Sequence, residues 1–168
     1  MKYHILILVL SAFSSFAQID KKAIKTQAEQ TAEALMKDDY EAMLKFTYPT
    51  VVDMIGGRDK FITVVKQGKD GLAQQGITIM QVTMGEPGET VKAGDEIHCL
   101  VPQTLILKLE NGKLKSESHL LAISKDQGKN WYFVDTAQLT ADNIKIILPN
   151  FNNDLKLPEK TQPQFIPD

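Results

Sequence analysis

The sequence has little of several residue types that carry specific chemistry. Its 168 residues include one cysteine, one arginine, one tryptophan and three histidines. A single cysteine excludes an internal disulfide, and so few cysteines and histidines leave no set of zinc ligands at the usual spacing. Lys and Arg together number 19 against 21 for Asp and Glu, so the basic surplus typical of nucleic-acid-binding proteins is missing. We therefore expect no metal ion and no nucleic-acid partner.

Signature motifs of common enzyme classes are missing as well. The chain contains no G-x-S-x-G, no phosphate-binding loop, no G-x-G-x-x-G, no H-E-x-x-H and no C-x-x-C. These motifs build nucleophile elbows, nucleotide sites, zinc sites and redox sites, respectively. We therefore expect no cofactor, and any catalysis must use ordinary acid–base side chains.

Long apolar runs are absent, and the longest uninterrupted one is residues 5–10. Lys2 precedes this run, and Ser15 and Ala17 put small residues at the −3 and −1 positions of a cleavage site before Gln18. A membrane-spanning helix needs about 20 apolar residues. We therefore predict that residues 1–17 are a cleaved signal peptide, that the chain has no membrane span, and that it is exported to the periplasm or the medium.

The remaining chain has the composition of one globular domain with a tail. Apolar residues make up 43% of the sequence and charged residues 24%. Four of the seven prolines follow residue 148, which predicts an extended tail over residues 149–168 that lies on the surface or is partly disordered. We assign residues 18–148 to a single domain, in which residues 141–148 form a short helix.

Helical periodicity dominates the first half of this domain. Residues 20–37 carry apolar side chains at helical spacing. Asp38 and Glu41 form a capping-box pattern for a second helical region, which ends at Gly56-Gly57. A third helix is expected over residues 58–75. Its apolar stripe consists of Phe61, Val65, Gly68 and Leu72.

Strand patterns follow in the second half. We predict strands over residues 77–84, 96–109, 113–125 and 131–136. Asn111-Gly112 is the typical turn of a two-residue hairpin, so Glu110 is expected to face Lys113. In this register His98 and His119 lie about six residues apart along the ladder, roughly 20 Å, which is too far to share a metal ion.

Alternation in the hairpin predicts one apolar face interrupted by polar residues. Gln103, Ser116 and Ser118 fall among the apolar positions, whereas His119 falls on the other face. Polar groups converging within an apolar surface are typical of a small-ligand pocket, but they also occur as hydrogen-bonded residues near a rim. Cys99 lies in an apolar stretch and is expected to be buried and unreactive.

Arg58 is the only arginine beside eighteen lysines. It begins a predicted helix, where a guanidinium can bind an anionic ligand. The alternative is an internal salt bridge, for instance to Asp53 or Glu41.

Three segments resemble the nuclear transport factor 2-like superfamily. They are residues 37–43, 48–52 and 56–61, and Trp131 at the start of the last strand also fits. The resemblance covers residues 20–137. It implies an α+β fold in which N-terminal helices pack in the concave side of a curved antiparallel sheet of about four strands, forming a cone. A short C-terminal helix and an extended tail follow. Members of this superfamily are often dimeric, and the cone is open in some and filled in others.

The resemblance also includes ketosteroid-isomerase-like enzymes, in which a carboxylate moves a proton and a tyrosine or a protonated acid stabilises an oxyanion. Asp135, His119, Tyr48 and Asp53 are the available residue types, but none matches a catalytic position of those enzymes. We therefore expect an exported, non-catalytic domain that binds a small ligand or a protein partner through Gln103, Ser116, Ser118 and Arg58. The alternatives are a small isomerase or cyclase with an acid–base site in the cone, and a homodimer formed through the sheet.

Overall fold

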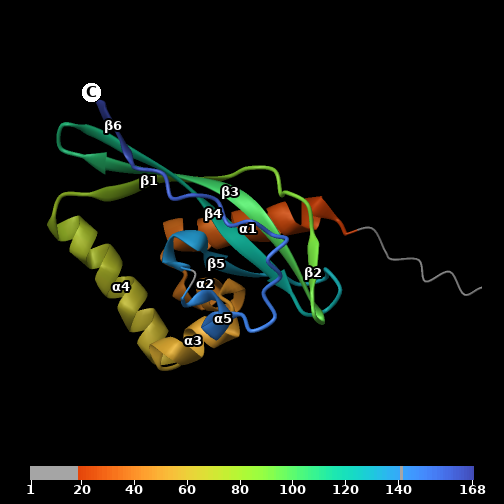
Figure 1. The fold of residues 1–168 in the computed structure, drawn as a ribbon. Coiled ribbons are helices and arrows are strands. Elements are labelled where there is room, and N and C mark those ends of the chain that lie inside the picture. The colour runs from red at the N-terminus through yellow and green to blue at the C-terminus, as the bar shows by residue number, and fades with distance from the viewer. Residues whose placement is uncertain (1–18, 141) are drawn as a thin grey trace, which may run out of the picture.

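The computed structural model describes residues 19–140 and 142–168 as an α+β domain. Four N-terminal helices precede a curled antiparallel sheet, and a short helix and an extended segment end the chain (Figure 1). This is the predicted fold class. The predicted signal peptide lies outside the described residues.

Local signals position the N-terminal helices. Helix α1 (Lys21–Met36) begins where the Asp20 carboxylate accepts a hydrogen bond from Lys22 N. Helices α2 (Tyr40–Phe46) and α3 (Pro49–Ile55) follow, and α3 ends at Gly56, whose φ of 107° suits glycine. Helix α4 (Arg58–Gln74) starts directly afterwards.

The cap of α2 differs from the prediction by one residue. Asp39, not Asp38, accepts a hydrogen bond from Ala42 N. Asp38 has a positive φ of 58° and its carboxylate instead contacts Lys69 and Tyr40. The ion pair with α4 thus takes Asp38 away from the helix start, and the neighbouring aspartate replaces it.

Within residues 19–140 and 142–168 the sheet has six strands, two more than the sequence predicted. Its main path is β1 (Thr78–Met84), β3 (Glu96–Leu109), β4 (Gly112–Ser124) and β5 (Tyr132–Asp135). The short strands β2 (Val91–Ala93) and β6 (Gln164–Pro167) pair with β3 and β4, respectively. All named strand pairs are antiparallel.

The hairpin register differs from the predicted one. Leu109 pairs with Gly112, so the turn is Glu110-Asn111 and the predicted Asn111-Gly112 turn is wrong. Gly112 itself belongs to β4 and lies directly against strand β6, where a Cβ would meet the carbonyl oxygen of Ile166. Each residue of one strand therefore faces a partner two positions away from the predicted partner. Because side chains alternate with a period of two, each side chain stays on its predicted face.

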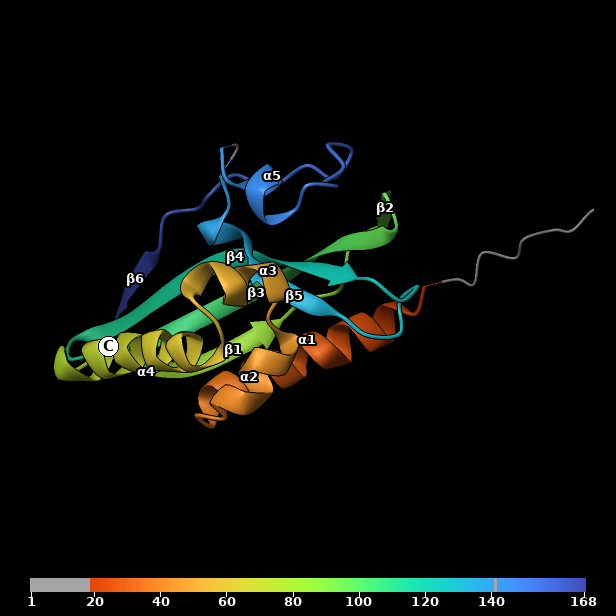
Figure 2. The ribbon, with the colours of Figure 1, turned by 90° about the horizontal axis from the view of Figure 1, so that it is seen from below.

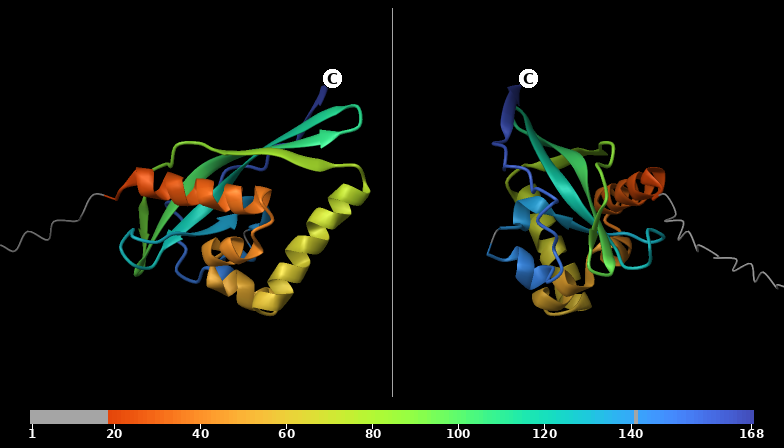
Figure 3. Two further views of the ribbon diagram at one scale, coloured as in Figure 1. Left: turned by 180° about the vertical axis from the view of Figure 1, so that it is seen from behind. Right: turned by 45° about the vertical axis from the view of Figure 1, so that its right-hand side comes forward.

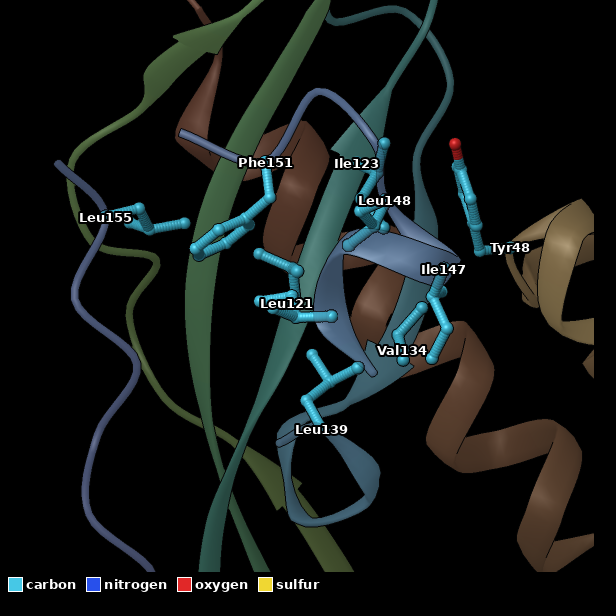
Figure 4. Close-up of a cluster of buried hydrophobic side chains, with 10 residues drawn as sticks. Tyr48, Leu121, Ile123, Val134, Leu139, Ile147, Leu148, Phe151 and Leu155 are labelled. Carbon is cyan, nitrogen blue, oxygen red and sulfur yellow. The ribbon is translucent and has the colours of Figure 1, made fainter. Parts of the chain in front are cut away.

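Both faces of the sheet are covered where β3, β4 and β5 run together, so the fold has three layers (Figure 2). The inner, concave face carries Cys99, Val101, Leu120 and Ala122, which pack against Ile24 and Ala28 of α1 and against Trp131 and Phe133. The outer face carries Leu121, Ile123 and Val134 beneath the C-terminal segment (Figure 4). The sequence predicted only the inner core, although Cys99 is buried as expected.

The C-terminal segment forms the outer layer. It comprises a 3-10 turn η1 (Thr136–Gln138), helix α5 (Ile144–Ile147) and the chain that follows. Phe151 and Leu155 of the predicted tail are buried in the outer core, and the tail ends as β6. The tail is therefore extended, but its first part is not a surface segment. Within the described residues, no helix is long and apolar enough to cross a membrane.

Candidate functional site

Three polar side chains from three neighbouring strands meet on the inner face. Gln103 of β3 lies opposite Ser118 of β4, and Asp135 ends β5 opposite Leu120. The Gln103 amide nitrogen donates to Ser118 Oγ at 2.8 Å and to Asp135 Oδ2 at 2.8 Å. The three side chains, which we call the polar cluster, are half-buried. The fold thus joins two predicted ligand-binding residues to one acid–base candidate.

The hydrogen bonds within the polar cluster leave mainly acceptors free. Asp135 Oδ1 accepts a hydrogen bond from Ala137 N at 2.9 Å, which caps η1. Because Gln103 uses its amide nitrogen for both contacts, its Oε1 has no partner among the described residues. The carboxylate of Asp135 likewise retains lone pairs, since each of its oxygens can accept more than one hydrogen bond.

Apolar side chains surround the polar cluster along the inner face. The register puts these half-buried side chains on the same face: Ile79, Val82, Met84, Leu105, Leu107 and Leu114. Ser116 also lies there, opposite Leu105. This end of the inner face extends beyond the reach of α1 (Figure 3).

Helix α4 leaves this part of the inner face only partly covered. Its close neighbours are α2 and α3 rather than the strands, and Figure 3 shows it slanting away from the sheet. Of its predicted apolar stripe, only Phe61 is buried, whereas Val65 and Leu72 are half-buried. An apolar surface with a few convergent polar groups is the usual lining of a small-ligand site.

Arg58 and Asp53 form no hydrogen bond with the polar cluster. Arg58 pairs with Glu41, one of the two salt-bridge partners predicted for it, and its other nitrogen lies 2.7 Å from Asp59. Asp53 is exposed near the end of α3. The guanidinium is therefore already occupied by two carboxylates.

The outer face holds a second polar group, centred on Glu96, which sequence reasoning missed. Tyr48 Oη donates to Glu96 Oε1 at 2.9 Å, and His98 Nε2 lies 3.1 Å from Glu96 Oε2. Lys125 Nζ is 3.5 Å from Glu96 Oε1 and 4.8 Å from the centre of the Tyr48 ring. The even-numbered alternation of Glu96, His98 and Leu100 along β3 is the signal that could have placed them on one face.

Three members of this outer group are buried, and only Lys125 is exposed. Tyr48, Glu96 and His98 are 3%, 6% and 0% exposed, and Phe151 stacks on the His98 ring at 6.0 Å. Burial raises the pKa of Tyr48 and lowers the pKa of His98. Among the described residues, His98 Nδ1 has no hydrogen-bond partner. A tyrosine and a carboxylate do meet here, but they join α3 to the sheet and leave no access for a substrate.

His119 takes no part in either group. It lies opposite Pro102, on the outer face, four residues along β3 from His98. The predicted separation of six residues was wrong because it used the wrong turn. Four residues still amount to about 13 Å, so the two histidines do not share a metal ion.

Two surface hollows lie near the start of α1. One, of about 610 Å³, is lined mainly by the first turns of α1 together with Phe46 and Asn130. The other, of about 480 Å³, is lined by residues 19–22 with Glu89 and Thr90. Neither contains a residue of the polar cluster, and both lie where the described chain begins.

Comparisons of the chain with protein-family models, with curated proteins and with solved structures gave no match. Function is therefore inferred from the residues and their geometry.

Proposed function

We propose that this protein is an exported, non-catalytic domain of the nuclear transport factor 2-like type that holds a small ligand on the inner face of its sheet. The observation that carries the proposal is the meeting of Gln103, Ser118 and Asp135 among half-buried apolar side chains. The apolar surface supplies binding energy, and the polar cluster orients the ligand. A curled sheet with helices on its concave side is compatible with that superfamily.

The proposed export depends on residues 1–17 acting as a signal peptide that is cleaved after Ala17. The mature protein would then be located in the periplasm or the medium. The lone thiol suits an oxidising compartment. Burial raises the pKa of Cys99 to about 11, so the thiol stays protonated and unreactive there.

The alternative is a small isomerase- or cyclase-type enzyme. Such chemistry needs a carboxylate or histidine within hydrogen-bond reach of an oxyanion-stabilising group and open to a substrate. Tyr48 and Glu96 satisfy the distance but are sealed. Asp135 faces the inner side, but both of its oxygens already accept hydrogen bonds, from the Gln103 amide and from Ala137 N, and no tyrosine or carboxyl group among the described residues hydrogen bonds to it. These contacts favour binding over proton transfer.

A homodimer through the sheet is a second candidate. Its support is the exposure of apolar side chains on the outermost strands, with Met80 49%, Phe165 53% and Ile166 40% exposed. Edge strands of this kind pair readily with another chain unless they are protected.

Native mass spectrometry of the full chain, produced with its own N-terminus and purified from the cell envelope, tests these proposals together. The expected result is a chain that begins at Gln18 and carries a mass excess that is lost on denaturation. A Gln103→Leu, Ser118→Ala double variant is expected to lose the excess, whereas an Arg58→Lys variant keeps it. A folded protein without any excess, also after exposure to envelope extract, would contradict the ligand proposal, and a species of twice the mass would support the dimer. An uncleaved chain would contradict the signal peptide.

A further inference from the structure

We propose that the ligand on the inner face is a cationic amphiphile, an apolar molecule with an ammonium group that contacts Asp135. The inference rests on the proposed function and adds the chemical class of the ligand. Three features of the inner face support it: the charge of the polar cluster, the acceptor character of its free hydrogen-bonding atoms, and the apolar surface beside it.

The charge of the polar cluster is negative and is not neutralised by a neighbouring side chain. Asp135 is its only ionisable member, and the groups that hydrogen bond to it, the Gln103 amide and Ala137 N, are neutral. Among the described residues, no lysine or arginine forms an ion pair with Asp135. Lys160 donates to the carbonyl oxygen of Ala137 instead. A half-buried carboxylate without a cation favours a ligand that brings one.

The free atoms of the polar cluster point to a donor. The Gln103 amide nitrogen donates to Ser118 and Asp135, and within the described part of the chain its Oε1, an acceptor, has no partner. An ammonium group has three N–H donors and no acceptor, so it can satisfy this oxygen and the carboxylate together. A ligand carboxylate would meet the Asp135 charge and an amide oxygen, both of which repel it.

The apolar surface gives the shape of the remainder of the ligand. Leu105 and Leu107 follow Gln103 at alternate positions of β3, and Leu114 lies opposite Leu107 on β4. The four residues from Gln103 to Leu107 span about 13 Å along the strand. A medium-length alkyl chain or a flat ring system covers this distance while its ammonium group contacts Asp135.

Three probes that share a decyl chain and differ in the headgroup separate the contribution of the headgroup from that of the alkyl chain: decylamine, decanol and decanoate. Each probe is titrated against the full-length protein at concentrations below those at which the probe forms micelles. We expect decylamine to bind at least tenfold more tightly than decanoate, with decanol between them. Higher salt is expected to weaken the binding of decylamine and to leave the binding of decanol unchanged, because only decylamine forms a charge pair with the protein.

Two matched variants locate the effect. Asp135→Asn removes the charge but retains an oxygen for Ala137 N, so the preference for decylamine over decanol is expected to disappear. Glu117→Gln removes a carboxylate from the outer face of the adjacent strand and is expected to leave the preference intact. Circular dichroism is used to check that both variants fold. If a variant does not fold, the probe series on the unaltered protein still tests the inference.

The outcomes are distinguishable. If none of the three probes binds, the inference about a cationic amphiphile is overturned, and the mass excess in native mass spectrometry decides separately whether the proposed function holds. If they bind equally well, or if decanoate binds best, the inner face is a ligand site but the inference about an ammonium group is overturned. A preference for decylamine that survives in Asp135→Asn also overturns it, because the cation would then contact another group.

Discussion

Phe151 tests whether the C-terminal segment belongs to the folded core. The sequence predicted an extended surface tail here, yet the Phe151 side chain is 8% exposed and packs with Leu148 and Leu155 over the sheet. It also stacks on the ring of His98, at an interplanar angle of 26°. We therefore predict that Phe151→Ala destabilises the whole domain and does more than loosen its end.

The expected loss follows from burial. Removing a buried phenylalanine costs about 3–5 kcal/mol, including the cavity that remains. Phe151 belongs to a layer near the end of the chain that can partly collapse, so we expect about 3 kcal/mol. That is a large share of the ~5–15 kcal/mol that holds a domain folded. Ile146→Ala is the matched control, because Ile146 of α5 is 65% exposed and its loss is expected to cost less than about 0.5 kcal/mol.

Urea unfolding followed by tryptophan fluorescence measures both variants. Trp131 is the only tryptophan and belongs to the inner core, so it reports on the far side of the sheet from Phe151. A loss below about 1 kcal/mol in Phe151→Ala would refute the assignment of this segment to the core. If Phe151→Ala is too unstable to measure, Phe151→Leu is expected to shift the midpoint in the same direction by a smaller amount.

Four further predictions concern single positions. Gly112→Ala is expected to release β6, measured as faster amide hydrogen exchange at residues 164–166, because its Cβ would meet the carbonyl oxygen of Ile166. Gly68 lies on α4 with open space around it, so Gly68→Ala is expected to raise the free energy of unfolding by about 0.5–1 kcal/mol. A decrease in the free energy of unfolding would contradict the placement of this residue inside a helix. Cys99 is expected not to react with a thiol reagent at pH 8 until the domain unfolds, since burial raises its pKa to about 11. Burial lowers the pKa of His98 below 6.5, so the unfolded chain binds a proton that the folded chain does not. Stability is therefore expected to fall as the pH drops from about 6.5 to about 5.5, above the range in which the carboxyl groups are protonated. This fall is expected to persist in the control variant His119→Gln and to be lost in His98→Gln, as urea titrations across pH can measure.

Local chemistry explains how much of the fold could be predicted. Helices begin and end where nearby residues cap them, as at Asp20 and Gly56, and such signals act within a few positions of the chain. Strand alternation has a period of two, so the hairpin faces survived a shifted turn. Gln103 and Ser118 could be assigned to one face for this reason. The turn itself was predicted wrongly: Gly112 pairs with Leu109 and lies against strand β6, a contact between residues far apart in the sequence.

The candidate site depended on contacts between distant parts of the chain. Asp135 meets Gln103 only because β4 lies between β3 and β5, and the order of strands is not written in any local pattern. The Glu96 group was missed because alternation shows which residues share a face but not whether another layer covers that face. Only the tertiary structure brings Phe151 over His98 and seals it.

The sequence by itself thus determined the fold class, most of the helix ends, the strand faces and the candidate polar residues, since these follow from propensities and periods within a few residues. The tertiary structure decided which of those residues meet. It joined Gln103, Ser118 and Asp135, occupied Arg58 with Glu41, and buried Tyr48 beneath the C-terminal segment. The reason is physical: burial and hydrogen bonding between strands depend on segments separated by tens of residues, and no local pattern encodes that pairing.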